Sequence, residues 1–454
     1  GERLLRDLDL IGIVDVVAWR PQNAPRLLAE RLGARPGREI VSAIGGEIPL
    51  TLVNHVAEEI AHGRVRAAFV GGSSTVRTLR NADRAGRKLE YPQGGEGEPE
   101  LFGENKNGAS ELEMAHGLAM PIHVYPVFEN ALRARRGLSL DEHRRRLGAL
   151  MTRFTRVAAQ NPYAWFPVER SAEELTQVSA ENRMIAFPYT KYLNAVLETD
   201  QAAGVLVMSR DAARAHGIPD DRMVYWWGGA NGVEAQWFVS ERPDFHSCPA
   251  MRQTLLGALE HAGSGIDEIR HIDFYSCFPV AVEMAAEALG LAEDDPRGFT
   301  LTGGLPYAGG PGNNYTLHSL ATLVGRLRED PGSRGLVSGN GWYLTKHSAG
   351  VYSSAPPPHD VAAAKAPAPA PTAAAVRPIA EAEGDARVET YTVLYDRDGA
   401  PAQGVVIGRL DDGRRFLANL DASRAALERL VETELVGRAG RVSHVDGRNR
   451  FEPR

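Results

Sequence analysis

Five side chains that can move a proton or attack a carbonyl carbon lie beside glycine-rich or turn-like segments in the second half of the chain. A cysteine thiol can act as a nucleophile, and an imidazole can transfer a proton near neutral pH. A phenol can do so only when its pKa, ordinarily about 10, is lowered. Each also has a structural interpretation, because buried cysteines, hydrogen-bonded histidines and space-filling tyrosines are common in protein cores. The candidates are Tyr275, Cys277, His318, Tyr343 and His347.

The glycine-rich segments beside these candidates read GGLPYAGGPGNN at 303–314 and GLVSGNG at 335–341. His318 lies about one helical turn after the first segment, and His347 follows the second. Neither segment has the G-x-G-x-x-G or Walker spacing that cradles a nucleotide phosphate. The sequence therefore gives no support to a nucleotide-binding loop, and the glycines are better suited to tight turns.

Strand-like runs alternate with amphipathic helical segments through the first 354 residues. This alternation predicts an α/β fold in which helices cover both faces of mixed sheets. Two such halves are predicted, at 1–120 and 199–354, with a helix-rich loop domain at 121–198 between them. The predicted strands are 67–72, 204–209, 269–275 and 335–341, and the predicted helices are 49–62, 280–291 and 316–330. The polar, glycine-rich segment 91–108 is predicted to be a surface loop.

The composition changes abruptly after residue 354. Residues 355–384 are rich in Ala and Pro and lack hydrophobic periodicity, which predicts an extended linker. Residues 385–454 contain several strand-like runs, the turn signals DRDG and DDGR, and one helical segment. We expect a small β-rich domain of the OB type, with a split β-α-β arrangement as the alternative.

Composition and charge exclude several classes of function. The net charge of −7 over 454 residues gives no basic surface for nucleic acid. No apolar run approaches the roughly 18 residues that a membrane span needs. The two cysteines, Cys248 and Cys277, cannot build a disulfide framework or a zinc ribbon, so we predict a cytoplasmic protein without a metal site. The chain starts without Met, and we expect a native segment to precede it.

Several blocks in a fixed order resemble the thiolases, and most closely the sterol-carrier-protein-X type and thiolase-like acetyl-CoA acetyltransferases. The resemblance covers residues 1 to about 354 and implies the layered αβαβα thiolase fold. The blocks read SAIGGEIPLTLVNHVAEEIAHG with AAFVGGSS, DQAAGVLVMS, DFYSCFPVAVEMAAEALGL, TLTGGLPYAGGPGNNYTLHS and SGNGWYLTKHSAGVYS.

The resemblance also shows which functional groups are missing. Thiolases use a nucleophilic cysteine, a histidine in Gly-His-Pro that activates it, and a second cysteine in C-x-G-x-G that moves the α-proton. Here these positions hold Ala43, Gly310 and Val337. Alanine cannot form a thioester, and Ser42 is an adjacent but displaced hydroxyl. The block that reads NEAF or HDCF in relatives contains Tyr275 and Cys277.

The resemblance therefore implies a protein that binds CoA or an acyl-CoA, with acyltransferase ancestry, a role in lipid metabolism and weak or no thiolase activity. It implies no covalently bound cofactor. The glycines that would present backbone amides to a thioester are Gly309, Gly310, Gly339 and Gly341. A first alternative is retro-aldol cleavage of a β-hydroxyacyl-CoA by Tyr275 and Tyr343, as in related aldolases that associate with an OB-fold partner. A second is an interaction or scaffold protein that acts through its C-terminal domain. Either a monomer or a homodimer is compatible with the sequence.

Overall fold

The first sheet contains the predicted strands 67–72 and 204–209, which are β3 and β7, together with three strands that were not predicted. The computed structural model describes residues 2–363, 374–420 and 423–454. The strand order is β4-β2-β1-β3-β7, and only β7 runs antiparallel to its neighbour. The bounds are β1 (Leu10–Ile13), β2 (Arg38–Ser42), β3 (Ala67–Thr75), β4 (Glu100–Phe102) and β7 (Asp200–Met208). Strand β4 lies inside the segment 91–108, so the prediction of a surface loop throughout that segment was wrong.

The second sheet belongs to the second half of the chain. Its order is β8-β11-β10-β9, in which β9 and β10 are parallel and the other pairs antiparallel. Strands β10 and β11 are buried along nearly their whole length, as expected of a sheet covered on both faces. The bounds are β8 (Tyr225–Val233), β9 (Ile269–Asp273), β10 (Arg334–Gly341) and β11 (Lys346–Ser353).

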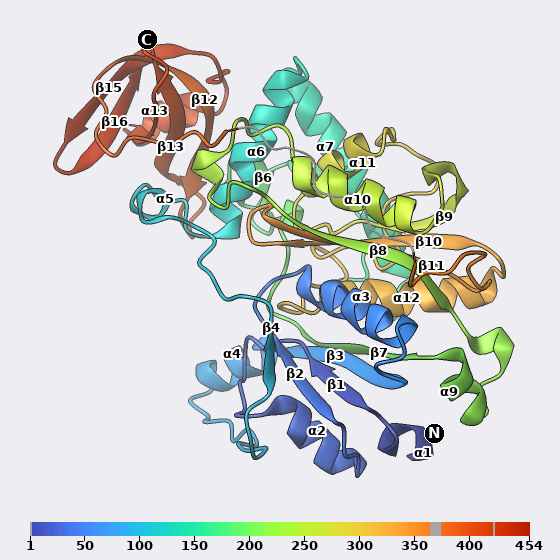
Figure 1. Ribbon diagram of the computed structural model, residues 1–454. Helices are drawn as coiled ribbons and strands as arrows, with labels where there is room; N and C mark the ends of the chain where they lie inside the picture. The colour runs from blue at the N-terminus through green and yellow to red at the C-terminus, as the bar shows by residue number, and fades with distance from the viewer. Residues whose placement is uncertain (1, 364–373, 421–422) are drawn as a thin grey trace.

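Helices fill the space between the two sheets and cover their outer faces (Figure 1). Helices α3 and α12 form the middle layer, where each contacts strands of both sheets. Helix α2 packs on the first sheet, and helices α10 and α11 form the layer beyond the second sheet. The bounds are α2 (Ala24–Leu32), α3 (Ile48–Ala61), α10 (Pro249–His261), α11 (Pro279–Ala288) and α12 (Tyr315–Glu329). This layered mixed α/β arrangement is the predicted fold class, which is thereby confirmed.

The region between the halves is helical. Helix α6 (Pro121–Arg135) is followed by α7 (Leu140–Gln160), the longest helix of the described residues. Helix α7 begins at a capping box, because the Ser139 hydroxyl accepts from the Glu142 N–H while the Glu142 carboxylate accepts from the Ser139 N–H. One face of α7 is buried, and the short strands β5 (Met184–Ala186) and β6 (Tyr189–Thr190) follow.

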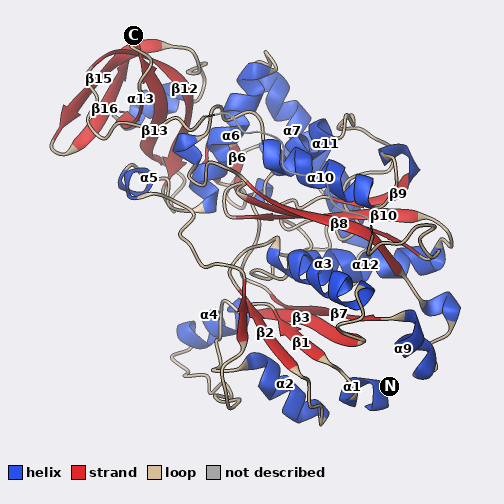
Figure 2. Cartoon of the chain, in the orientation of Figure 1, coloured by secondary structure: helices blue, strands red, loops and turns tan. Residues whose placement is uncertain are grey.

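The C-terminal strands close into a barrel (Figure 2). The pairing runs β12-β13-β14-β16-β15 and returns to β12, so it is not a split β-α-β arrangement. Strands β14 and β16 are parallel, and the other pairs in this circuit are antiparallel. The bounds are β12 (Gly384–Tyr395), β13 (Pro401–Leu410), β14 (Arg415–Leu420), α13 (Arg424–Leu430), β15 (Ala439–Val445) and β16 (Arg448–Pro453). Part of the predicted linker, 364–373, lies outside the described residues.

The barrel is joined to the rest of the molecule by buried polar contacts. The fully buried Arg415 donates to the carbonyl oxygens of Ser240 and Pro243 at 3.1 Å each and to that of Arg242. Its guanidinium also pairs with Glu389. In addition, β12 pairs with β5 of the helical region. These contacts hold the barrel against the rest of the molecule in addition to the linker.

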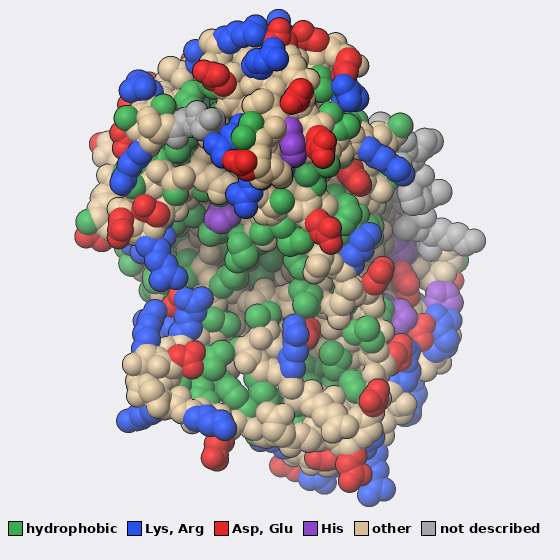
Figure 3. Space-filling model, turned by 90° about the vertical axis from the view of Figure 1, so that its left-hand side faces the viewer, with side chains coloured by type: hydrophobic (Ala, Val, Ile, Leu, Met, Phe, Trp, Pro, Cys, Tyr) green, Lys and Arg blue, Asp and Glu red, His purple; other side chains and the backbone are tan. Residues whose placement is uncertain are grey.

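The molecular surface is hollowed between the barrel side and the N-terminal half. Figure 3 shows hydrophobic side chains gathered in this hollow, with charged side chains around it. Among the described residues, no helix is long and apolar enough to cross a membrane.

Replacing Arg415 by Met should destabilise the molecule by about 3–5 kcal/mol, because it leaves the carbonyl groups of Ser240, Arg242 and Pro243 without this donor and leaves Glu389 paired with Arg409 alone. Chemical denaturation measures this loss. The neighbouring Arg414 pairs with Asp412 in solvent, so Arg414→Ala is the matched control and should cause no measurable change. Equal stability of R415M and the wild type would show that the barrel is not held by this contact.

Candidate functional site

Blocks that are far apart in the sequence meet at the start of helix α3. The Asn313 side chain accepts from the Gly45 N–H at 3.1 Å and donates to the Asp15 carbonyl at 3.0 Å. The loop after β9 reaches the same point, because a Cβ on Gly46 would lie 2.1 Å from the Tyr275 hydroxyl. A Cβ on Gly341 at the end of β10 would lie 1.7 Å from a Glu47 carboxylate oxygen. The glycines are therefore needed for close packing at this centre.

The three positions that the thiolase resemblance assigns to catalytic groups hold no such group in this chain. Ala43 is fully buried, and the adjacent Ser42 hydroxyl donates to its carbonyl at 2.9 Å. Val337 is packed in an apolar cluster with residues of α3 and α12. Gly310 donates its N–H to the Val196 carbonyl at 2.8 Å. No thiol or imidazole stands at any of these positions.

A buried ion pair lies where the blocks meet. Lys346 Nζ lies 2.8 Å from Glu47 Oε1 and also donates to the Ile44 carbonyl at 2.7 Å. The two side chains are only 10% and 4% exposed. Burial raises the pKa of Glu47, and the Lys346 charge opposes this rise. This pair was not predicted from the sequence, although Glu47 directly before the apolar segment 48–53 was a usable signal.

Tyr275 and Cys277 are the two predicted candidates that the structure brings together at this centre. Asn340 Nδ2 lies 3.7 Å from the Cys277 Sγ and donates to the Tyr125 hydroxyl at 2.8 Å. Tyr125 stacks on Phe278 with ring centroids 4.2 Å apart. Burial raises the pKa of Cys277 to about 12 and that of Tyr275 well above its usual range. At neutral pH the thiol and the phenol are therefore protonated, which disfavours both as nucleophile or base.

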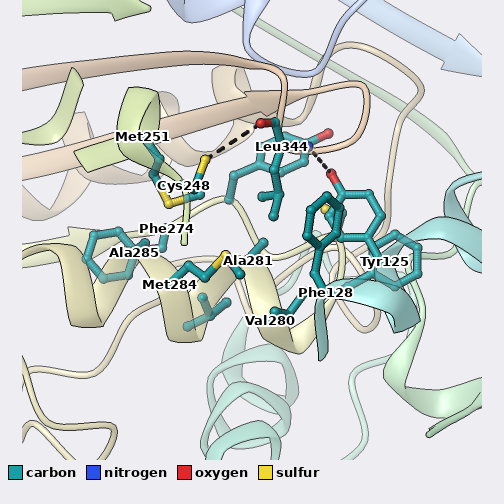
Figure 4. Packing of buried hydrophobic residues seen from close by; sticks show 14 of the residues in the cluster. Tyr125, Phe128, Cys248, Met251, Phe274, Val280, Ala281, Met284, Ala285 and Leu344 are labelled. Atoms are coloured by element: carbon teal, nitrogen blue, oxygen red, sulfur yellow. Dashed lines mark hydrogen bonds between the residues drawn. The ribbon is translucent and has the colours of Figure 1, made fainter. Parts of the chain in front are cut away.

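His347 belongs to a separate buried cluster. Its Nε2 lies 3.3 Å from Cys248 Sγ, which also donates to a Glu234 carboxylate oxygen. Figure 4 shows Cys248 and Tyr125 reaching the backbone of Leu344 from opposite sides, with the Leu344 carbonyl accepting and its N–H donating. Burial lowers the pKa of His347 to about 3, so its ring is neutral.

Tyr343 has a different environment from Tyr275. Its hydroxyl donates to the Ala119 carbonyl at 2.9 Å, at the junction with the helical region. Burial raises the pKa of Tyr343 to about 12. The two phenols proposed for a retro-aldol reaction therefore have different partners, and neither pKa is lowered.

His318 lines a cleft of about 1150 Å³ together with Gly309. The other walls come from the end of α7 and the loop after it, the start of β7, residues 300–302 and the outer face of α12. The cleft combines aromatic side chains (Tyr163, Trp165) with amide side chains. Burial lowers the pKa of His318 to about 4, and its Nε2 has no hydrogen-bond partner among the described residues.

The chain is similar to proteins of known structure and family. A family model described as "Thiolase-like protein type 1 additional C-terminal domain" matches residues 367–448. The crystal structure of a monomeric SCP2-thiolase like protein type 1 from Mycobacterium smegmatis superposes with a TM-score of 0.83 at 35% identity, covering 99% of this chain and 90% of that one. The benzoylsuccinyl-CoA thiolase subunit BbsB of Thauera aromatica is 27% identical over 195 residues, 42% of this chain and 45% of that relative. The match thus spans less than half of the curated relative.

Lys346→Met should destabilise the protein by about 3–5 kcal/mol, because it leaves the buried Glu47 carboxylate without its counter-charge. The double variant Glu47→Gln with Lys346→Met should recover at least half of that loss. A double-mutant cycle by chemical denaturation measures the coupling. The exposed pair of Arg214 and Asp220 is the control and should show no measurable coupling. Additive effects of the two core substitutions would contradict the pairing.

His318 and His347 should stay neutral from pH 7 down to pH 5. Their pKa values are lower in the folded than in the unfolded chain, so the stability they contribute is present above about pH 6.5 and is lost as the pH falls toward 4 and 3. For each histidine, the free energy of unfolding at pH 5 should be roughly 1 to 2 kcal/mol lower than at pH 7. Side-chain NMR of histidine-labelled protein, assigned with His318→Gln and His347→Gln, measures the titration. Midpoints near 6.5 for both rings would contradict the burial argument.

Proposed function

We propose that this chain, which belongs to the SCP2-thiolase-like proteins of type 1, binds CoA or an acyl-CoA and does not carry out the thiolase reaction. The thiolase resemblance predicted from the sequence blocks is confirmed by the full-length similarity to a solved member of that family. We propose both the binding of CoA or an acyl-CoA and the absence of the thiolase reaction.

The filled reaction centre is the observation that carries the proposal. Acyl transfer through the enzyme needs a thiolate within reach of the thioester carbon. Ala43 stands at the nucleophile position, and the nearby thiol of Cys277 is protonated and enclosed by Asn340 and Tyr125. The Glu47–Lys346 pair and the Tyr275 hydroxyl take up the space where the blocks meet.

The cleft beside Gly309 supports ligand binding next to this centre. Its size suits a ligand as large as the pantetheine arm and part of the nucleotide. The Gln201 Oε1 atom, which has no partner among the described residues, can accept from a pantetheine amide, and Arg326 can face a phosphate. Tyr163, which is 81% exposed at the rim, offers a ring on which adenine can stack.

The two alternatives have less support. A retro-aldol reaction by Tyr275 and Tyr343 needs at least one phenol with a lowered pKa, whereas burial raises both. A scaffold role would place function in the C-terminal barrel. The strand order and single helix of the barrel support an OB-type domain, which we propose serves a partner protein while the chain remains a monomer. A place in lipid metabolism follows from the proposed ligand.

Isothermal titration calorimetry with CoA and with dodecanoyl-CoA tests the ligand. One molecule should bind per chain, and Tyr163→Ala should weaken binding roughly tenfold through loss of the stacked ring. Arg414→Ala, on the barrel surface, should leave the affinity unchanged. Absence of binding by either ligand would refute the proposal.

The missing reaction needs a separate measurement. Incubation with acetoacetyl-CoA and CoA should give no acetyl-CoA, and mass spectrometry should find no acyl group on Cys277 or any other residue. The same assay with a β-hydroxyacyl-CoA should release no carbonyl product. Thioester cleavage lost in Cys277→Ala would instead show that a rebuilt nucleophile operates here.

A further inference from the structure

A cluster of metal-ligating side chains lies outside the site described above. It contains Glu129 of α6, His143 of α7 and Glu283 of α11. Their side chains are 0%, 2% and 1% exposed. One ligand atom from each residue lies within 4.8 Å of the others. Three helices from different parts of the chain therefore direct an imidazole and two carboxyl groups at one buried point.

Four side-chain atoms of the cluster have no donor or acceptor of ordinary hydrogen-bond geometry among the described residues, although the two carboxyl groups lie close enough to share a proton. They are Glu129 Oε1, Glu283 Oε2 and both ring nitrogens of His143. His143 Nε2 lies 2.8 Å from Glu129 Oε1, yet the pair lacks hydrogen-bond geometry. Neighbouring ligand atoms on a metal with bonds of about 2.1 Å lie about 3.0 Å apart in octahedral and about 3.4 Å apart in tetrahedral coordination, so a small widening of this contact would admit an ion.

The second oxygen of each carboxylate is held by the surrounding protein. Glu129 Oε2 accepts from the Tyr189 hydroxyl, and Glu283 Oε1 accepts from Arg136 Nη1 at 2.7 Å. Outer hydrogen bonds of this kind orient the ligands of metal sites. One oxygen of each carboxylate is thus fixed while the other is left to face His143.

The two buried carboxyl groups need a cation or a proton to compensate their negative charge. Burial raises the pKa of Glu129 and Glu283, and it lowers the pKa of His143 to about 4. The guanidinium of Arg136 is shared with Glu287 and Glu293 and cannot neutralise both carboxylates. The charged and titratable groups that face the cluster are Arg133, Arg136, Tyr189 and Glu293.

We propose that Glu129, His143 and Glu283 bind one divalent transition-metal cation of the class that accepts two carboxylates and an imidazole, such as Zn²⁺ or Mn²⁺. A cleft of about 1160 Å³ lined by Arg136 and Glu283 gives the ion an approach. The second candidate group, Glu234 with Cys248 and His347, differs because its carboxylate oxygen already accepts from Cys248 and from the Ala250 N–H.

The ion would fix the part of the molecule that lies behind the reaction centre. The Tyr189 hydroxyl that donates to Glu129 also accepts from the Val280 N–H at 3.4 Å. Val280 lies in the first turn of α11, shortly after Cys277 and Phe278. Occupancy would therefore tie α6, α7 and the start of α11 together as a structural metal site.

Metal content and affinity of the full chain test the proposal. The protein is treated with a chelator, dialysed against Zn²⁺ and then freed of unbound metal. Inductively coupled plasma mass spectrometry should then find one zinc ion per chain. Calorimetry with Mn²⁺ at pH 7.5 should show one binding site per chain. Glu283→Gln should weaken binding at least tenfold. Glu287→Gln, one turn later on α11 and also paired with Arg136, is the matched control and should keep wild-type affinity.

Two results would overturn the proposal. The first is wild-type protein that holds no stoichiometric ion and shows no Zn²⁺-dependent rise in melting temperature, which would mean that a shared proton alone fills the site. The second is Glu283→Gln, or His143→Gln if the first variant does not fold, that binds Mn²⁺ as tightly as E287Q. Circular dichroism of each variant establishes that it is folded before titration.

Discussion

The buried ion pair between Glu47 and Lys346 is the interaction on which the arrangement at the centre depends. Neither charge has much access to water, so each is tolerable only beside the other. The pair joins the start of α3 to strand β11, and Gly341 packs directly against the carboxylate. Side chains on Gly45 or Gly341 would collide with Glu47. Glycine is therefore needed at these positions, because a side chain there would occupy the space that the ion pair fills.

The fold of this protein and the chemistry of its central side chains lead to different conclusions. The α/β layers, the glycine turns and the helical region are those of a thiolase-type protein. The resemblance places Ala43 at the nucleophile position, and burial keeps the thiol of Cys277 and the phenol of Tyr275 protonated. The cleft beside Gly309 is lined by aromatic and amide side chains and is the binding surface that we propose. Inherited structure therefore supports ligand recognition better than it supports acyl transfer.

Much of the fold was predictable from the sequence, because its signals are local. Strand β10 and helix α12 follow directly from hydrophobic periodicity and glycine boundaries. Strand β4 was not predictable, since three residues in a polar segment become a strand only by pairing with β2. The assignment of Ala43, Gly310 and Val337 to the positions of lost catalytic groups rests on the ordered motifs that surround them and stays a prediction.

The contacts inside the site were harder to predict because they depend on tertiary geometry. Lys346, the partner of Glu47, is distant from it in the sequence, and no local sequence pattern links the two residues. Whether Tyr343 faces Tyr275 depends on backbone turns, and both neighbours of Tyr343 have positive φ values. The metal-ligating group likewise needs three helices to be placed before Glu129, His143 and Glu283 meet.

The central claim is that the thiolase centre is closed by its own side chains while the ligand binds beside it. A crystal structure with dodecanoyl-CoA bound tests this most directly. The thioester sulfur should lie in the cleft beside Gly309, with the Glu47–Lys346 pair intact. A sulfur in contact with Tyr275 or Cys277, together with a displaced Lys346 side chain, would contradict the claim.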